Sequence, residues 1–427
     1  METEVKLVYY DRLLERTLRS ISDTFPVMVL TGPRQVGKTT LLQRMAETGR
    51  KYVALDNPTD RAMAKTEPEL FLQRYSPPVI IDEVQYAPEL FDYIKIHADK
   101  QKSCGDFWLT GSQTFHMMKN VTESLAGRAG IIRMLGLSNS EIEATGFGQF
   151  EVEPQMLIDR LDIATHMAMP AIYERIFKGS FPRLYENPDV DRKQFYESYL
   201  ETYLSRDIKD LTQIADEIAF LTFMNVVAAR TATNVNYDTL ANETGISAPT
   251  AKHWLSILVS SGLVALIPIF SNNALKRTIK APRMYFLDTG LCAYLTRMNS
   301  PEFLEGSAMD GAFFETWVVS EIYKSYLNNG IRPPLYFYRD QNKKEIDLII
   351  NQNNVVNPIE IKKGAAPKAA TKSFSALKPI EEEPSEEDHF SGTAHIKTKI
   401  GTGAVICLAS NVTPIDKNNW YVPAWLI

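Results

Sequence analysis

The chain has 427 residues, 44% of them hydrophobic and 23% charged, which is the composition of an ordinary globular protein with roughly two to four domains. The formal net charge of −6 excludes a generally basic nucleic-acid-binding protein, so any such binding has to come from a local patch. The three cysteines, Cys104, Cys292 and Cys407, stand far apart, which excludes a disulfide framework and predicts a reducing compartment.

Membrane and export signals are also missing from the sequence. No apolar run approaches the roughly 18 residues that span a bilayer. The first six residues, Met-Glu-Thr-Glu-Val-Lys, have neither the basic start nor the apolar core of a signal peptide. We therefore expect a cytoplasmic protein with no membrane partner.

The first predicted elements are an amphipathic helix over 10–22 and a buried strand over 27–30. Directly after the strand comes the pattern Gly32-x4-Gly37-Lys38-Thr39, and helix-forming side chains follow it over 40–45. A strand, a glycine-rich loop and a helix in this order are the context in which this pattern binds nucleotide phosphates.

The glycine-rich loop is the candidate phosphate site. Its backbone N–H groups can converge on phosphate oxygens, and the helix N-terminus adds partial positive charge. Lys38 would reach the β- and γ-phosphates, and the Thr39 hydroxyl would ligate Mg2+. The alternative is an ordinary glycine turn before a helix. The predicted cofactors are ATP and Mg2+, and the predicted cofactor-binding residues are Gly32, Pro33, Arg34, Gln35, Val36, Gly37, Lys38, Thr39 and Thr40.

Two acids follow a later buried strand. A second strand is predicted over 52–55, and the run 79–84 then ends in Asp82 and Glu83. Asp82 would hold the magnesium ion and its waters, and Glu83 would polarise the water that attacks the γ-phosphate. The alternative is a strand that simply enters solvent on two carboxylates.

The run 107–113 predicts a further buried strand that ends in small polar groups. Ser112 or Gln113 would sense the γ-phosphate there, unless this segment is only a turn built on Gly111. Arg128 is a candidate arginine finger toward a γ-phosphate, with a solvated surface arginine as the alternative. Alternating strands and helices over 1–165 predict a parallel, helix-covered sheet.

The middle of the chain is predicted to be helical and then to form a winged helix-turn-helix. Helices are expected over 171–177, 193–211 and 217–229, giving a lid domain over 166–232 in which Arg206 is a possible lid arginine or an intrahelical ion-pair partner.

Residues 233–300 have the helix, glycine turn, serine cap and second helix of a helix-turn-helix, with a wing strand over 263–269. Duplex DNA is the predicted partner, and packing or protein contact is the alternative. The candidate DNA-contacting residues are Ser247, Thr250, Lys252 and His253 on the second helix and Lys276, Arg277, Lys280 and Arg283 on the wing.

Residues 301–427 are predicted to form an α/β domain with a restriction-endonuclease-like fold. A helix over 310–327, which contains Glu315 and Glu321, precedes strands over 334–338, 345–350 and 355–363, and further strands are expected over 404–409 and 420–427. Asp347 and Glu360 would ligate one Mg2+, and Lys362 would activate water. The alternative is an inactive domain that keeps these residues for structure.

These motifs together resemble a known family. The chain is similar to the predicted AAA-type P-loop ATPases of bacteria and archaea, whose C-terminal domain of unknown function resembles the PD-(D/E)xK nuclease fold. The resemblance implies ATP binding and the domain order above. It rests on the segments 32–39, 80–83, 109–113, 125–128, 280–291, 345–347 and 359–362.

The predicted function is an ATPase whose nucleotide state controls the winged-helix and nuclease-like module, acting on DNA. A second hypothesis is a nucleotide-switched regulatory or scaffold protein that binds protein partners. A homo-oligomer is compatible with both, and the sequence leaves open whether an arginine finger acts within one subunit or between subunits.

Overall fold

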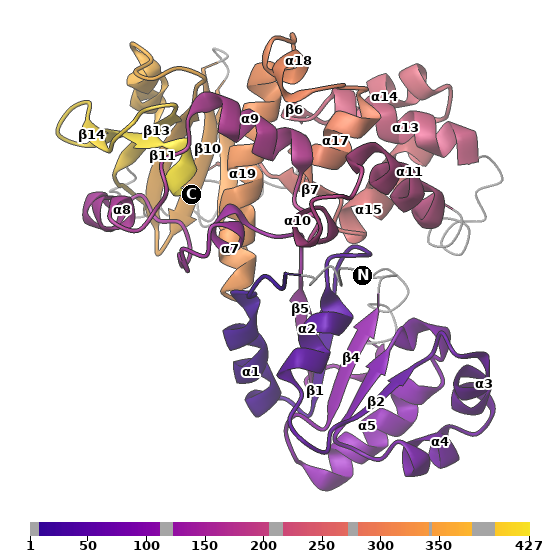
Figure 1. Ribbon diagram of the computed structural model, residues 1–427. Helices are drawn as coiled ribbons and strands as arrows, with labels where there is room; N and C mark the ends of the chain where they lie inside the picture. Colours follow the sequence, from indigo (N-terminus) through magenta and orange to yellow (C-terminus); the bar gives the residue numbers. More distant parts are fainter. Residues whose placement is uncertain (1–7, 112–122, 205–216, 272–280, 341–343, 378–397) are drawn as a thin grey trace, which may run out of the picture.

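The computed structural model describes residues 8–111, 123–204, 217–271, 281–340, 344–377 and 398–427. Within these ranges no helix combines the length and the apolar character that crossing a bilayer requires. Figure 1 shows a lower lobe built around one sheet and an upper body in which a long helix stands between a second sheet and a group of helices.

The lower lobe holds the predicted parallel sheet, with strand order β2-β3-β4-β1-β5. The central strands β3, β4 and β1 are buried throughout and therefore read as largely apolar runs, whereas the edge strands β2 and β5 are partly exposed. The bounds are β1 Val27–Thr31, β2 Lys51–Ala54, β3 Val79–Asp82, β4 Phe107–Gly111 and β5 Ala129–Arg133.

Helices cover both faces of this sheet because successive side chains of a strand point to opposite sides. Met28 and Leu30 of β1 pack with α1 (Leu14–Thr24) and α2 (Lys38–Met45). Val27 and Val29 belong to a separate buried cluster on the other face, which includes side chains of α3 (Pro58–Thr66), α4 (Pro68–Arg74) and α5 (Leu90–Gln101).

The helices of the upper body do not form a free-standing unit. The helix α9 (Met169–Lys178) contacts α17 (Thr289–Leu295) and α18 (Pro301–Glu305), which follow more than a hundred residues later. The remaining helices between 139 and 229 are α7 Asn139–Ile142, α8 Pro154–Leu161, α10 Arg183–Glu186, α11 Arg192–Thr202 and α13 Glu217–Ala229. Arg206 lies outside the described residues.

A helix-turn-helix follows as the sequence indicates. Asn236 caps α14 (Tyr237–Thr244), Gly245 ends it at φ +77°, and Ser247 caps α15 (Ala248–Ser260). An antiparallel three-stranded sheet of order β6-β8-β7 flanks these helices. Its strands are β6 Thr233–Asn234, β7 Val264–Ile267 and β8 Arg283–Phe286. Lys276, Arg277 and Lys280 lie outside the described residues.

The C-terminal part is a mixed seven-stranded sheet packed on α19 (Asp310–Asn328). The expected strand over 420–427 is wrong in its second half, where the chain turns into a short 3-10 helix, η4 (Ala424–Leu426). The other elements are β9 Leu335–Arg339, β10 Glu345–Gln352, β11 Val355–Ile361, η3 Ala370–Ala376, β12 Lys399–Ile400, β13 Gly403–Cys407, β14 Thr413–Pro414 and β15 Asn419–Pro423.

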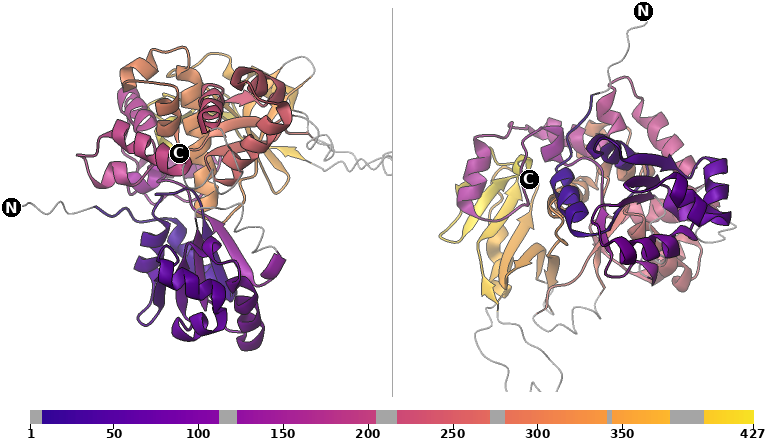
Figure 2. Two further views of the ribbon diagram at one scale, coloured as in Figure 1. Left: turned by 90° about the vertical axis from the view of Figure 1, so that its right-hand side faces the viewer. Right: turned by 90° about the horizontal axis from the view of Figure 1, so that it is seen from below.

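The helix α19 is the centre of the molecule. A single buried cluster runs from the α1–α2 face of the parallel sheet, through α19 and the helices around it, to β11 and β13 of the C-terminal sheet. The left view of Figure 2 shows the lower lobe beneath this continuous upper body. The carboxyl ends of the parallel strands, where ligands bind in open α/β sheets, face the upper body.

Candidate functional site

The glycine-rich loop joins β1 to α2 at the carboxyl edge of the parallel sheet. Three of its residues have left-handed backbone conformations, Gly32 (φ +141°), Gln35 (φ +60°) and Gly37 (φ +92°). A Cβ on Gly32 would lie 2.0 Å from the Met134 carbonyl oxygen, so only glycine fits at this point. The sequence pattern therefore forms a turned loop that is fixed against the segment following β5.

Lys38 lies inside this loop. Its side chain is buried, and its ammonium group donates to the carbonyl oxygens of Gly32 at 3.0 Å and Pro33 at 2.8 Å. The cation is therefore already held on the concave side of the backbone that would surround a phosphate.

The acid at the end of β3 contacts the loop directly. The Thr39 hydroxyl donates to Oδ2 of Asp82 at 2.8 Å, the Tyr52 hydroxyl donates to the same oxygen at 3.1 Å, and the Glu83 N–H donates to Oδ1 at 3.1 Å. Burial raises the pKa of Asp82, and the hydrogen bond from Thr39 opposes that effect. A hydroxyl and a carboxylate side by side are oxygen ligands of the kind that Mg2+ binds together with nucleotide phosphates and water. The two residues thus fit the predicted metal.

Glu83 follows Asp82 at the same edge of the sheet. Its backbone is left-handed at φ +54°, and the Gln85 amide donates to its carboxylate. Glu83 is partly exposed, whereas Asp82 is buried. The two neighbouring acids thus have different environments, as different roles at one site require.

Two residues around the loop were not predicted. Arg12, which is almost fully buried, donates to the carbonyl oxygens of Val36 at 3.0 Å and Leu135 at 2.8 Å and pairs with Glu141 at 3.0 Å. Tyr52, described above, reaches Asp82 because β2 lies beside β3. Neither has a local sequence signal, since each acts on a residue that is distant in the chain.

Arg128 is on the wrong edge of the sheet for the predicted finger within one chain. It comes just before β5, so it lies at the amino-terminal edge, where the Val27 N–H donates to its carbonyl oxygen. Its guanidinium group pairs with Asp99 of α5 at 2.5 and 3.0 Å. The prediction is therefore wrong for the same subunit. Ser112 and Gln113 lie outside the described residues.

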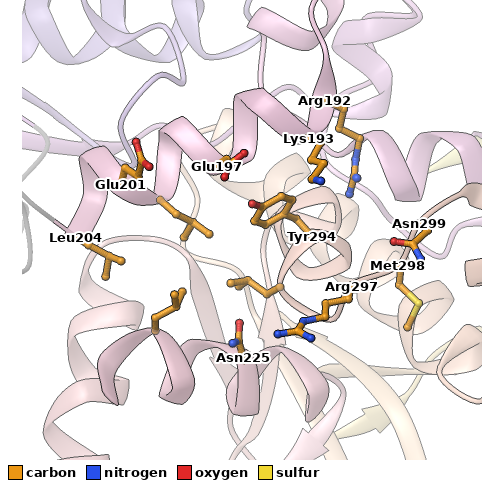
Figure 3. A pocket seen from close by; sticks show the side chains of 13 residues that line it. Arg192, Lys193, Glu197, Glu201, Leu204, Asn225, Tyr294, Arg297, Met298 and Asn299 are labelled. Atoms are coloured by element: carbon orange, nitrogen blue, oxygen red, sulfur yellow. The ribbon is translucent and has the colours of Figure 1, made fainter. Parts of the chain in front are cut away.

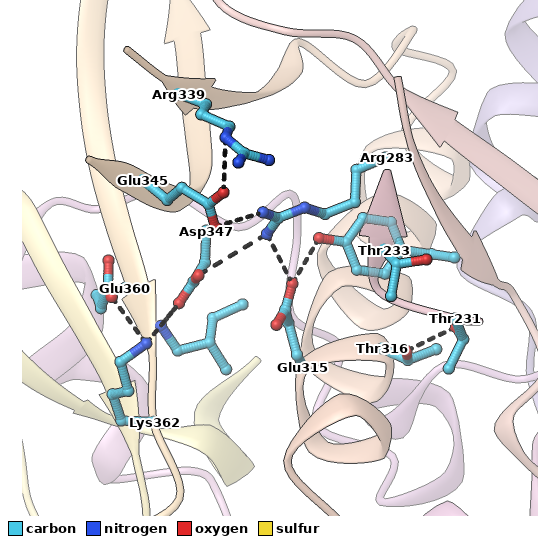
Figure 4. A network of polar contacts seen from close by, with 12 residues as sticks. Thr231, Thr233, Arg283, Glu315, Thr316, Arg339, Glu345, Asp347, Glu360 and Lys362 are labelled. Carbon is cyan, nitrogen blue, oxygen red and sulfur yellow. Dashed lines mark hydrogen bonds and ion pairs between the residues drawn. The ribbon is translucent and has the colours of Figure 1, made fainter. Parts of the chain in front are cut away.

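A second polar site lies between β10 and β11, as predicted (Figure 4). The Lys362 ammonium contacts Oδ2 of Asp347 at 3.1 Å and Oε1 of Glu360 at 2.7 Å. The Ile361 N–H also donates to Oδ2 of Asp347, at 2.9 Å. The three residues chosen from the sequence are therefore in contact with one another.

Arg283 enters this site from β8. Its guanidinium lies 3.2 Å from Glu315 of α19, 3.2 Å from Glu345 and 3.8 Å from Asp347 of β10. Its side chain is only 6% exposed, so the prediction that Arg283 contacts DNA phosphates from the wing is wrong. We call Arg283, Glu315, Glu345, Asp347, Glu360 and Lys362 the carboxylate cluster.

Burial shifts the protonation of the carboxylate cluster. Burial, with a further contribution from the Asp347 charge, raises the pKa of both Glu315 and Glu360 to about 7. Burial alone would lower the pKa of Lys362, but the charges of Asp347 and Glu360 outweigh it and the net pKa is raised. Lys362 therefore stays a cation, and the predicted role of Lys362 in activating water remains a prediction.

The predicted Mg2+ does not fit the carboxylate cluster in this arrangement. Asp347 and Glu360 already face the Lys362 ammonium, and Arg283 approaches Asp347 from the other side. Across the described ranges no group of three or more His, Cys, Asp or Glu side chains is arranged to hold a metal ion. The cluster is a network of ion pairs between two parts of the chain.

The second helix of the helix-turn-helix has a polar exposed face. Lys252, His253 and Ser256 of α15 are exposed, whereas Ala251, Trp254 and Leu255 are buried. Ser247 and Thr250 share a hydrogen bond at 2.7 Å in the helix cap. Two of the four residues predicted to contact DNA from this helix are thus involved in its capping.

A cavity lies away from both sites, between α11, α13 and α17 (Figure 3). It has a volume of about 600 Å³. Side chains of both charges line it, among them Lys193, Glu197, Glu201 and Arg297. None of the residues predicted for a site lies in it.

Three family models match successive parts of the chain. Residues 24–143 match the family model described as "AAA domain", so the chain carries an AAA-type P-loop ATPase domain. Residues 169–302 and 310–427 match two models described as "Domain of unknown function", DUF8612 and DUF4143. The first of these spans both the predicted lid and the predicted winged helix.

Two curated relatives are uncharacterized proteins of mycobacteria, Rv2008c of Mycobacterium tuberculosis and Mb2031c of Mycobacterium bovis. Each is 27% identical to this chain over 363 residues, which are 84% of this chain and 75% of the relative.

Similar solved structures include a Walker-type ATPase of Pyrococcus abyssi, with 14% identity, a TM-score of 0.42 and coverage of 67% of this chain and 96% of that one. Another is the RuvB Holliday junction branch migration motor of Thermotoga maritima, with 18% identity, a TM-score of 0.28 and coverage of 60% and 89%.

Proposed function

We propose that the protein binds ATP with Mg2+ at the glycine-rich loop and hydrolyses it. The observation that carries this proposal is the 2.8 Å hydrogen bond between Thr39 and Asp82, which joins the loop to the acid of the neighbouring strand. These are the two side chains that would hold the metal. Mg2+ would neutralise charge on the phosphates as the terminal phosphate leaves.

The other residues of the loop have distinct roles in this proposal. Lys38 exchanges the carbonyl oxygens of Gly32 and Pro33 for phosphate oxygens, and the N–H groups at the start of α2 receive the remaining charge. Glu83 orients the attacking water as a general base. Arg12 holds the loop by its bond to the Val36 carbonyl oxygen and does not touch the phosphates.

Steady-state hydrolysis of ATP with and without Mg2+ tests the proposal. Glu83→Gln should bind a fluorescent ATP analogue as wild type does and lose most hydrolysis. In Asp82→Asn, Mg2+ should no longer stimulate ATP hydrolysis. Glu69→Gln, which alters an exposed acid of α4, is the matched control. A wild-type protein that binds no ATP, or a Glu83→Gln variant of full activity, would contradict the proposal.

A second candidate function, duplex DNA binding, is favoured by the exposed Lys252 and His253 on α15. Both lie in the helix that enters the major groove in helix-turn-helix proteins. We propose that the ATPase acts on DNA through this surface. The C-terminal domain then serves as a module that does not cut DNA, because its carboxylates are neutralised by Arg283 and Lys362.

Fluorescence anisotropy with a labelled duplex at several salt concentrations tests DNA binding. Lys252→Ala should weaken binding and reduce the dependence on salt by about one phosphate contact, whereas Lys100→Ala on α5 should not. Absence of duplex binding, with ATP-dependent assembly of the protein, would favour the scaffold alternative. Plasmid cleavage with Mg2+ that Glu360→Ala abolishes would show that the C-terminal domain is a nuclease.

A further inference from the structure

We propose that the strand pair β7–β8 transmits the state of the nucleotide loop to the carboxylate cluster, with Arg283 as its output residue. This inference rests on the proposed binding of ATP. It assigns to Arg283 a regulatory contact between two parts of the chain instead of a contact with DNA.

The input end of the strand pair touches the nucleotide loop itself. Gly262 lies in the turn that leads into β7, with a left-handed backbone at φ +76°. A Cβ on Gly262 would lie 3.1 Å from Cδ of Pro33 and 3.5 Å from a Leu135 methyl group. Pro33 is the second residue of the glycine-rich loop, so a change in the loop's backbone reaches this turn without an intermediate.

The strand pair is joined to the sheet edge by a second contact. Leu135 follows β5 and packs with Ala265 of β7 and Leu287, which follows β8. The segment that contains Leu135 also carries Met134, whose carbonyl oxygen closely approaches Gly32. Pro33 and Leu135, which lie close together in the ATPase domain, therefore both contact the β7–β8 strand pair and the turn that leads into it.

The β7–β8 strand pair, which we call the ribbon, is short and regularly hydrogen-bonded. Val264 pairs with Phe286 and Ile267 pairs with Arg283, and the Leu287 N–H donates to the Leu263 carbonyl oxygen at 2.9 Å. Each strand has four residues, and Arg283 stands at the end of β8 away from the turn, opposite the last residue of β7. Because packed interiors shift as units and do not deform continuously, a displacement at Gly262 moves the other end of the ribbon.

The output end joins three elements through one side chain. Arg283 contacts Glu315 of α19 and both Glu345 and Asp347 of β10, and the Tyr285 hydroxyl of the same strand donates to Glu315 at 2.7 Å. Figure 4 shows the guanidinium between the helix and the C-terminal strands. A small shift of β8 therefore changes the charge balance of the whole carboxylate cluster.

One donor of Arg283 is left unpaired among the described residues. Its Nε is buried and has no hydrogen-bond partner among the described residues. A buried donor without a partner makes a conformation less favourable, so we infer that a shift of β8 lets the guanidinium adopt a second position in which Nε is paired. A bistable contact is what an allosteric link requires.

Amide hydrogen exchange on the full-length protein, with and without Mg-ATPγS, tests the link. In the wild type, nucleotide should change the exchange rates of β10 and β11 by at least threefold. Arg283→Gln should bind nucleotide as wild type does and lose this change. Arg339→Gln is the matched control, because Arg339 also pairs with Glu345, at 3.1 Å, but is exposed and belongs to the C-terminal sheet itself. It should keep the change.

A second variant covers the case in which Arg283→Gln does not fold. Arg283→Lys keeps the buried positive charge but has no planar fork for several carboxylates, so the nucleotide effect on β10 should fall at least by half. An unchanged effect in Arg283→Lys, or a wild type that binds nucleotide without any change in β10 and β11, would overturn the link. A wild type that binds no nucleotide would instead refute the proposed function.

Discussion

The glycine-rich loop and the carboxylate cluster are both places where acids and a lysine meet at strand ends, yet they are built differently. The loop uses backbone geometry, and its Lys38 interacts with carbonyl oxygens. The cluster uses side chains from β8, α19, β10 and the end of β11, and its carboxylates are already paired with Lys362 and Arg283. A site formed by backbone groups can therefore remain available to bind an anion, whereas in a site formed by opposite charges the side chains already pair with one another.

The largest expected effect is on the rate of ATP hydrolysis at the glycine-rich loop. Lys38→Ala should reduce the rate of ATP hydrolysis on the order of 10²- to 10³-fold, because it removes a preorganised cation from the reacting phosphates. The measurement is steady-state hydrolysis. Arg19→Ala on α1, which removes an exposed cation of the same domain, should leave the rate unchanged. Equal losses in both variants would mean that Lys38 has no special role.

The second prediction tests how far the carboxylate cluster depends on its own cations. Arg283→Gln should lower the free energy of unfolding by about 3–5 kcal/mol, since it removes the buried cation that Glu315, Glu345 and Asp347 share. Arg339→Gln removes an ion pair whose partners are both about two-fifths exposed and should cost less than about 1 kcal/mol. Urea unfolding measures both. Similar costs for the two arginines would contradict the picture of a buried charge network.

The third prediction concerns pH and applies only to the carboxylate cluster. Because the folded pKa of Glu315 and Glu360 is raised from 4.5 to about 7, the folded state holds protons that the unfolded chain releases in this range. Their contribution to stability therefore falls as the pH rises from about 4.5 to 7. Between pH 5 and 7.5, wild type should lose about 1–3 kcal/mol more than Glu360→Gln does. Urea unfolding at several pH values measures both proteins. An equal change with pH in their free energies of unfolding would refute the prediction.

The smallest expected effect concerns the hydrogen bonds that Asp82 accepts beside the glycine-rich loop. Tyr52→Phe removes one hydrogen-bond donor from Asp82 but keeps those from Thr39 and Glu83. Hydrolysis should slow about fivefold, which corresponds to about 1 kcal/mol. Tyr75→Phe deletes a similar hydroxyl that donates to Asp60 at 2.7 Å, away from the loop, and should have no effect on the rate.

The sequence predicted those parts of the molecule that local patterns determine. The loop over 32–39, the acids at the end of β3 and the strand pair with Asp347 and Glu360 all follow from short motifs on elements of clear periodicity. The AAA domain model over 24–143 supports the first two.

The parts that could not be predicted depend on contacts between distant segments. Arg12 acts on Leu135, and Arg283 on Glu345, across separations that no periodicity encodes. Arg128 was misjudged for a different reason. In a parallel sheet, a residue just before a strand lies at the amino-terminal edge, whereas a loop that follows a strand lies at the carboxyl edge. Arg128 stands just before an apolar run in the sequence, which already indicates that it lies at the edge opposite to the glycine-rich loop.

The central position of α19 has a consequence for how the chain folds during synthesis. Helices α9 and α17 are made before residues 310–328, yet both pack on α19. Until that helix leaves the ribosome, α9 and α17 can contact each other, but the part of their apolar surface that packs on α19 stays uncovered and depends on chaperones or on transient non-native contacts. The AAA domain has no such delay, because α1 and α2 supply one face of its sheet early in synthesis. Protein released by stalling before residue 310 should therefore contain a folded lower lobe and an aggregation-prone middle.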